Sequence, residues 1–408
     1  MSTTRWSVTC LVAALVVFPT SFEAQSLLDR ARALHKSAPL IDGHNDFPWA
    51  LREKSPGRDL MVLDIAQPQP SIMTDIPRLR AGGVGGQFWS VYVPSSMQGK
   101  DAVRATLEQI DIVHRMAAKY PDTLTLTRTA DDVERAFKAG RIASLIGLEG
   151  GHSIDSSLAT LRMMHALGAG YMTLTHSTNV PWADSATDTP VHGGLSAFGE
   201  EVVREMNRLG MLVDLSHVSP DTMADAIRVS KAPVIFSHSS ARAIADVPRN
   251  VPDDILKQVG ATGGVVMVTF VPGFIAPDAG LQYPQLAALA KQHAGDLDAL
   301  RKARAEFRKT NPEPRATLAM VADHIDHIRT VAGIDHVGLG GDFDGIDSVV
   351  EGLEDVSKYP HLTAELLRRG YGDEDIRKIL GKNILRVMRR AESVANSLAA
   401  TPPSVATH

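Results

Sequence analysis

The hydrophobic residues of this chain fall into short runs that alternate with longer segments of helical spacing. Most of the short runs are continuously apolar, which is typical of parallel strands that are covered on both faces. These runs predict eight strands, at residues 40–46, 85–93, 142–150, 171–176, 211–217, 234–238, 264–270 and 336–345.

The segments between these strands are amphipathic and predict helices. Their ranges are 102–120, 130–139, 157–167, 199–209, 220–229, 252–259 and 318–331. Strand–helix alternation repeated around eight strands favours an α/β fold, the (β/α)8 TIM barrel. One or two further helices are expected over residues 363–397.

An insertion at residues 272–315 separates the seventh strand from the helix that follows it. Its charged segment GDLDALRKARAEFRKTNPEP predicts one extra surface helix. In a barrel this connection lies at the end of the strands where active sites form. A lid or substrate-gating element, a subunit contact and an inert solvated insertion all remain open interpretations.

The amino terminus has the layout of a secretory signal peptide. Arg5 precedes an apolar stretch from Val8 to Phe18, which is short for a membrane span. The alternative is an uncleaved membrane anchor. The chain is therefore predicted to have a signal peptide at 1–24, a single barrel domain at 27–397 and a flexible tail at 398–408.

Composition limits the cellular environments and the binding partners that are plausible. The single cysteine, Cys10, lies inside the predicted signal peptide, so the mature chain would have neither a disulfide nor a thiolate for catalysis or metal binding. The net charge of −5 and the absence of a long basic run argue against nucleic acid as a partner. We expect an exported protein, periplasmic or secreted, with no stable membrane anchor after signal cleavage.

Residues able to do chemistry gather at the carboxyl ends of six predicted strands. They are His44, Asp46, Glu149, His176, His217, His238, and Asp342 with Asp344. In a parallel barrel these ends converge on one mouth. His44 and Asp46 are two residues apart, so an extended strand would point both to the same side.

Unpaired carboxylates and imidazoles crowded into one pocket would be unfavourable, and a divalent cation would relieve this. Imidazole and carboxylate ligands without a thiolate suit zinc, manganese, iron or cobalt, and zinc is the usual choice for hydrolysis. The number of ligands exceeds what one open zinc site needs. Two metals sharing a bridging carboxylate would account for the surplus and would hold an activated hydroxide between them.

Several motifs carry a family resemblance: IDGHND, GLEGGH, LTHSTNVPWADSA, LVDLSHVS, VIFSHSSARAI, PRNVPDD and VGLGGDFDGI, followed by EGLEDVSKYP. Together they resemble the membrane (renal) dipeptidases, peptidase family M19 of the amidohydrolase superfamily. The likeness extends from about residue 27 to about residue 390. It implies an amidohydrolase-like barrel with two zinc ions that cleaves dipeptides, including those with a C-terminal D-residue.

The resemblance also implies which residues hold the metals. His44 and Asp46 are similar to the ligands of one zinc, and His217 and His238 are similar to those of the other. Glu149 resembles the carboxylate that bridges the two ions.

Three more residues acquire roles from the same likeness. His176 resembles the histidine that contacts the substrate and steadies the oxyanion, and Asp342 resembles the acid/base that shuttles the proton. Arg249, in PRNVPDD, resembles the arginine that pairs with the substrate carboxylate. A planar guanidinium matches a terminal carboxylate with two hydrogen bonds, which favours dipeptides over internal peptide bonds.

Some neighbouring residues stay open as alternatives. Asp342 and Asp344 would share a side of a strand, so periodicity cannot choose between them, and Asp344 could be structural. Asp42 falls on the same face as His44, and at most it is expected to support the neighbouring ligands by hydrogen bonding. His152 is expected to be structural or pocket-lining, and Arg242 is a less favoured rival of Arg249.

Two other functions compete with dipeptide hydrolysis. One is a related amidohydrolase acting on another small amide, a lactam or a lactone. The other is an exported binding protein without activity, which would not require polar groups at so many strand ends. Small dipeptides are the expected partners, and a homodimer is consistent with the family.

Overall fold

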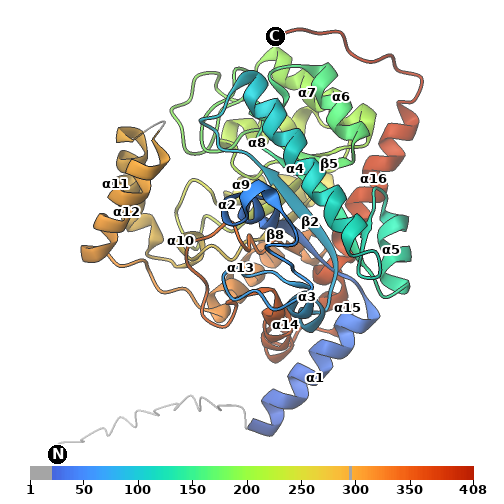
Figure 1. Cartoon of the computed structure of the whole chain (residues 1–408), viewed down its shortest axis with the longest axis vertical. Coiled ribbons are helices and arrows are strands. Elements are labelled where there is room, and N and C mark those ends of the chain that lie inside the picture. Colours follow the sequence, from blue (N-terminus) through green and yellow to red (C-terminus); the bar gives the residue numbers. More distant parts are fainter. Residues whose placement is uncertain (1–20, 294–295) are drawn as a thin grey trace, which may run out of the picture.

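The computed structural model describes residues 21–293 and 296–408. Eight parallel strands close into a barrel surrounded by helices (Figure 1), which confirms the predicted fold class. The barrel strands are β1 (Leu40–Asn45), β2 (Val84–Tyr92), β4 (Ile142–Glu149), β5 (Ala169–Thr173), β6 (Leu212–Asp214), β7 (Ile235–Ser239), β8 (Val265–Val268) and β9 (Val337–Leu339).

The strands follow one another around the barrel in chain order, and pairing of β2 with β4 along residues 86–92 and 143–149 continues the circle. A ninth short strand, β3 (Leu124–Leu126), pairs with the first residues of β4 and was not predicted. All eight predicted strands are present. Most are shorter than predicted. His44, Glu149 and His238 lie within strands, whereas the chain has left the sheet before Asp46, His176, His217 and Asp342.

The helices on the outside of the barrel begin where the sequence provides caps. Ser157, Ser196, Ser219 and Thr317 each accept a hydrogen bond from a backbone N–H in the first helical turn. The helices from the amino terminus to β8 are α1 (Ser21–Ser37), α2 (Phe47–Lys54), α3 (Ile76–Gly82), α4 (Gly99–Lys119), α5 (Ala130–Lys138), α6 (Leu158–Ala166), α7 (Ala197–Leu209), α8 (Pro220–Val229) and α9 (Asp253–Thr262).

The carboxyl-terminal third adds three helices after β9. They follow α13 (Leu318–Val331) and are α14 (Tyr359–Arg368), α15 (Asp373–Arg377) and α16 (Asn383–Ser397), with a π turn at Lys378–Lys382. Short 3-10 turns lie at Pro56–Arg58, Gly151–Ile154, Ile334–His336 and Val356–Lys358.

The hydrophobic core has an inner and an outer layer. Inside the barrel, Phe88, Leu145, Tyr171 and Met267 belong to one cluster with Met388 of α16. The outer layer packs the opposite strand faces against the surrounding helices. Burial on both faces explains why the strands are continuously apolar in the sequence.

The insertion contains more helix than predicted. After the short α10 (Pro272–Ile275), it forms α11 (Ala279–Gln292) and α12 (Leu297–Thr310), which stand at one side of the barrel (Figure 1). The single predicted surface helix corresponds to α12. The sequence did not indicate α11, because it is largely apolar and contains Pro284, which removes a helical hydrogen bond.

The structure describes the carboxyl-terminal end of the chain but not residues 1–20 at the amino-terminal end. Most of the predicted signal peptide, including Cys10, lies outside the described residues. Between residues 21 and 408, leaving out 294–295, no helix is both long and apolar enough to span a bilayer. At the other end, Ser404 donates to Glu201 at 3.0 Å, and the ring of His408 packs on Phe198. The flexibility of this tail stays a prediction.

Candidate metal centre and substrate pocket

Glu149 lies at the centre of the polar side chains at the barrel mouth. It is the last residue of β4 and is buried. Its Oε2 lies 3.4 Å from His44 Nε2, whereas its Oε1 lies 3.1 Å from His217 Nε2 and 3.6 Å from His238 Nε2. The two oxygens of one carboxylate therefore face two different sets of ligands, as a bridging group would.

The first set combines His44, Asp46 and Asp342, whose ligand atoms lie within 4.8 Å of one another. His44 Nε2 is 3.3 Å from Asp46 Oδ2. Asp46 stands just beyond β1, at the residue that begins α2, so a turn brings it to His44. The prediction that the two side chains lie together is correct, but it assumed that both residues belong to one extended strand.

The second set is formed by His217 and His238, whose Nε2 atoms are 2.9 Å apart. His238 belongs to β7, but His217 lies three residues after β6 with a φ of 72°. Asp342 likewise follows β9 with a φ of 61°. Non-glycine residues rarely adopt this left-handed conformation, and such residues cluster at functional sites.

A hydrogen-bonded tyrosine fixes the tautomer of His44. Tyr171 donates its hydroxyl proton to the carbonyl of Gly43 at 3.1 Å, so its oxygen accepts from His44 Nδ1 at 2.9 Å. In the neutral imidazole the proton is then on Nδ1, and the lone pair of Nε2 faces Glu149. Burial lowers the pKa of His44, but its anionic surroundings, Glu149 and Asp46 among them, outweigh burial and raise that pKa well above its usual value. Partners of this kind orient the histidine ligands of metals.

His238 is oriented in the same way by a different chain of groups. Ser237 donates to Asp214 Oδ2 at 2.6 Å, and its oxygen accepts from His238 Nδ1 at 2.8 Å. Thr173 also donates to Asp214. The free lone pair of His238 Nε2 therefore faces the site.

Burial and crowding shift the acid–base equilibria of these groups. Burial raises the pKa of Glu149, and it raises the pKa of Asp342 well above its usual range. For His217 and His238, burial and then positive neighbours such as Arg249 lower the pKa well below the usual value. Neutral imidazoles are the form that binds metals.

The residues present fit a pair of divalent cations. His44 Nε2 and Asp46 Oδ1 are buried without a hydrogen-bond partner among the described residues. Buried polar atoms of this kind are normally satisfied. The ligand atoms are nitrogens and carboxylate oxygens in three overlapping groups: His44, Glu149 and His238; Glu149, His176 and His217; and His44, Asp46 and Asp342. Two cations placed on either side of Glu149 would satisfy them.

His176 lies beside the second set, with its Nε2 3.5 Å from Glu149 Oε1. Its ring is 4.3 Å from the ring of His217, and its side chain is 16% exposed. Burial lowers its pKa well below the usual value, so it is neutral at pH 7. The ring thus offers a neutral imidazole at the border between metal ligands and solvent.

Arg249 is buried in the loop that follows β7. Its guanidinium donates to the carbonyl of His238 at 3.2 Å and to Ser239 Oγ at 3.4 Å, and it lies 5.2 Å from the ring centre of Phe274. Burial lowers its pKa to about 10, so it remains charged at neutral pH. Its rival Arg242 donates to the carbonyl of Pro248 at 2.7 Å and braces this loop.

The structure separates the two aspartates that the sequence could not. Asp342 joins His44 and Asp46, whereas Asp344 accepts from the backbone of Met73 at 2.6 Å. Burial raises the pKa of Asp344 to about 6. Gly345 is required beside them, because a Cβ there would be 2.2 Å from Asp46 Oδ2 and 2.7 Å from Asp342 Oδ1.

Two other candidates make hydrogen bonds to the backbone. Asp42 accepts from Gly341 N at 2.8 Å and from Gln87 Nε2 at 2.9 Å, and so ties β1 to the chain after β9. A register shift after Asp42 ends the regular alternation that the sequence analysis assumed. His152 bonds to the carbonyl of Val93 at 3.1 Å, as a structural role requires.

Two aromatic residues at the mouth were missed by the sequence analysis. Tyr92 ends β2 in register with Glu149, and its ring lies 5.0 Å from His176. Trp49 of α2 packs edge-on against Tyr92 at 5.1 Å. Tyr92 is the last residue but one of the predicted strand 85–93, and this place near a strand end is the signal that could have found it. An aromatic ring has none of the acid–base or charged chemistry by which the other candidates were recognised.

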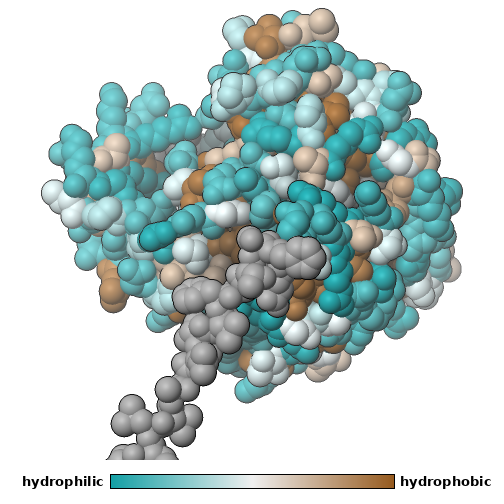
Figure 2. All heavy atoms as spheres, turned by 90° about the horizontal axis from the view of Figure 1, so that it is seen from below, coloured by the Kyte–Doolittle hydropathy of each residue, from teal (hydrophilic) through white to brown (hydrophobic). Residues whose placement is uncertain are grey.

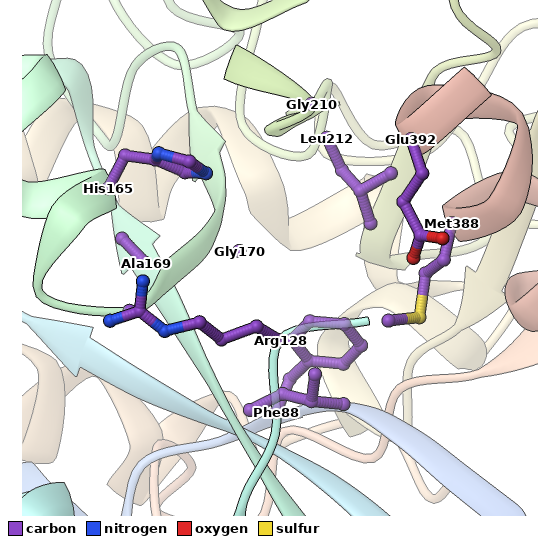
Figure 3. Close-up of a pocket in the computed structure, with 11 residues that line it drawn as sticks. Phe88, Arg128, His165, Ala169, Gly170, Gly210, Leu212, Met388 and Glu392 are labelled. Atoms are coloured by element: carbon purple, nitrogen blue, oxygen red, sulfur yellow. The ribbon is translucent and has the colours of Figure 1, made fainter. Parts of the chain in front are cut away.

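A small cavity lies at the opposite, amino-terminal end of the strands (Figure 3). Its volume is about 40 Å³, and Arg128 and His165 face Met388 and Glu392 of α16 across it. Phe88 forms part of its floor. No predicted site residue lines it.

The fold and the site define a metal-dependent hydrolase of the barrel class. Residues 28–402 match the membrane dipeptidase family, peptidase family M19, and the chain belongs to it. Two curated relatives are dipeptidases. Dipeptidase 3 of Rattus norvegicus is 44% identical, over 93% of this chain and 70% of its own length. Dipeptidase verJ of Clonostachys rogersoniana is 42% identical, over 92% of this chain and 89% of its own.

A solved structure agrees with these relatives. A metallo peptidase of Rhodobacter sphaeroides, liganded with a phosphinate mimic of the dipeptide L-Ala-D-Ala, is 25% identical with a TM-score of 0.72. The match covers 87% of this chain and 99% of that one. The predicted family is therefore confirmed, and with it the prediction that the chain is a metallo-dipeptidase.

Proposed function

We propose that this chain is a dizinc dipeptidase whose metals are held by the five residues that converge on the barrel mouth. The observation that carries this proposal is the position of Glu149, whose two oxygens face separate ligand sets. In the proposed site, His44 and Asp46 hold one zinc and His217 and His238 hold the other. A zinc pair of this kind supplies an activated water and polarises the carbonyl of the peptide bond.

Arg249 binds the carboxylate of the dipeptide. Its buried fork makes only two long hydrogen bonds within the described residues, at 3.2 and 3.4 Å, which leaves donors for a ligand. Internal peptide bonds offer no carboxylate at this point, so longer chains lose a charge-assisted interaction. This accounts for a preference for dipeptides.

Asp342 transfers a proton during the reaction, and His176 stabilises the negative charge that develops on the substrate. Asp342, beside His44 and Asp46, accepts the proton of the attacking water and returns it to the leaving amine. His176 donates a hydrogen bond to the oxyanion, which stabilises mainly the transition state. A C-terminal D-residue is included among the substrates because the Rhodobacter relative was solved with a mimic of L-Ala-D-Ala.

Zinc content and chelation test the proposal on the purified protein. We expect about two zinc ions per chain, loss of dipeptide hydrolysis on chelation, and recovery when zinc or cobalt is returned. The substrates would be a panel of dipeptides that varies chirality at each position. Hydrolysis that survives complete removal of the metals would refute the mechanism.

The protein is also proposed to act outside the cytoplasm, in the periplasm or as a secreted enzyme. The charge and apolar pattern of residues 1–24 supports this. Amino-terminal sequencing of the protein from the exported fraction is expected to find a mature start near residue 25. A mature protein that begins at Met1 would contradict cleavage.

A further inference from the structure

The insertion starts beside the arginine proposed to bind the substrate carboxylate. Phe274 of α10 lies under the guanidinium of Arg249, and Asn250 donates its amide to the carbonyl of Phe274 at 2.8 Å. The first turn of α11 is equally close, because a Cβ on Gly280 would be 2.7 Å from the carbonyl oxygen of Asp246. The base of the insertion is therefore packed against the loop that carries Arg249.

The other end of the insertion reaches a different side of the mouth. Arg301 of α12 donates to Glu53 Oε1 at 2.9 Å. Glu53 belongs to α2, the helix that begins directly after Asp46. The insertion thus contacts the border of the site at two places, at the Arg249 loop and at α2.

Tyr283 of α11 packs partly buried against the core. Burial raises the pKa of its hydroxyl, and the charges of Arg249 and Arg242 act in the opposite direction. The first turn of α11 packs on the loop that carries Arg249 through Gly280, which brings α11 to the side of the mouth where the substrate carboxylate is proposed to bind.

Little core burial holds these two helices in place. Ala279 is the one fully buried residue of α11, and none of the residues of α12 with a described side chain is fully buried. The pair forms a largely hydrophilic projection on one side of the molecule (Figure 2). Segments with few buried contacts shift at low free energy, so single contacts at their edges influence where they lie.

We propose that α11 and α12 form the wall of the pocket for the C-terminal side chain, and that the Arg301–Glu53 pair sets its width. This inference rests on the proposed dipeptide hydrolysis and on Arg249 as the carboxylate anchor. With the pair formed, the wall favours dipeptides with a small C-terminal residue. An exposed ion pair shifts an equilibrium about two- to five-fold, so its loss widens the pocket without unfolding the protein.

Charge reversal of the two partners tests this in the zinc-loaded enzyme. The measurement is the kcat/KM for L-Ala-D-Phe divided by that for L-Ala-D-Ala. Arg301→Glu and Glu53→Arg are each expected to raise this ratio about two- to five-fold. The double variant, which restores opposite charges, is expected to return the ratio to that of the natural enzyme.

Lys309→Glu is the matched control, because it makes the same charge change on α12 at a lysine that pairs with Glu306 of the same helix. Its ratio is expected to stay unchanged, and equal melting temperatures would show that all variants fold. Unchanged ratios in both single variants, no restoration in the double variant, or an equal effect of Lys309→Glu would overturn the inference. If the natural enzyme cleaves neither dipeptide, the proposed function fails instead.

Discussion

The two ends of the barrel are built from the same strands but differ in how their polar residues are placed. At the carboxyl end, Glu149 lies within 3.6 Å of both His44 and His238. At the amino end, Phe88 and Met388 contribute to the inner apolar cluster and line a small cavity together with the charged side chains of Arg128 and Glu392. Parallel strands place all of their carboxyl ends on one side, so the loops that follow the strands can supply ligands there while the other side stabilises the fold.

The comparison also shows how the two ends are connected. Tyr171 belongs to the inner apolar cluster, yet its hydroxyl reaches His44 at the mouth. One side chain thus joins the packing of the barrel interior to the orientation of a proposed metal ligand. Substitutions at the mouth are therefore expected to reduce catalysis most, those between the two ends to weaken metal binding, and those near the amino end to change stability alone.

The largest effect is expected from Glu149→Gln at the mouth. A neutral amide cannot serve as an anionic bridge between two cations, so both metals should bind weakly and kcat/KM should fall by about 10⁴-fold or more. Metal analysis and kinetics on the same preparation measure the two effects. Retention of two tightly held metals would exclude the bridging role.

Arg249→Ala is expected to act on substrate binding alone. Loss of the carboxylate partner should reduce kcat/KM for dipeptides by about 10²-fold, equivalent to about 3 kcal/mol, while metal content stays the same. The matched control is Arg242→Ala, which removes the neighbouring arginine that braces the loop. If both variants lose dipeptide activity equally at unchanged zinc content, Arg249 has no special role.

Tyr171→Phe tests the connection between the two ends. It keeps the ring in the inner cluster but removes the hydroxyl that orients His44, so zinc affinity should fall by about 10- to 100-fold. Competition with a chelator of known affinity measures this. Full affinity in a folded variant would show that His44 keeps its orientation without the tyrosine.

The smallest effect on catalysis is expected near the start of β1 and β2, at His35. This buried histidine bonds to the carbonyl of Gly82 and to Thr363, and burial lowers its pKa to about 4. Below pH 6.5 the His35 imidazole becomes protonated in the unfolded chain but stays neutral in the folded protein. The free energy of unfolding therefore falls as the pH drops to 4. Denaturant unfolding at several pH values measures this contribution, about 3 kcal/mol in all.

His35→Gln is expected to unfold with about that much less pH dependence than the natural protein, at unchanged kcat/KM near neutral pH. The difference isolates His35, because the other titrating groups are common to both proteins. Parallel curves of stability against pH for the two proteins would show that His35 contributes nothing.

The sequence predicted the barrel because its pattern follows from burial. Strands covered on both sides are mostly apolar, as β2 and β4 are, and caps such as Ser157 and Thr317 begin helices where the pattern changes. The helix α11 was missed because it buries almost no side chains against the core, and burial on one face is what produces an amphipathic pattern. Its residues follow no amphipathic period, and Pro284 argues against a helix.

The membership of the site was predictable, whereas its geometry was not. Convergence at the mouth follows from strand direction, which brought Glu149, His217 and His238 together. The position of Asp46 after a turn, and the left-handed conformations of His217 and Asp342, depend on tertiary contacts that no local pattern encodes. For the same reason periodicity could not tell Asp342 from Asp344, and in the sequence only the family resemblance favoured Asp342.

Gly345 offers a way to judge divergent chains of this fold without an assay. The space that its side chain would fill is taken by oxygens of Asp46 and Asp342, so a larger residue there must shift the proposed metal ligand or the proposed acid/base. The residue lies outside the strands, so such a change need not disturb the barrel. A homologue that carries alanine or a larger residue at this position is therefore expected to keep the scaffold while its two carboxylates are arranged differently.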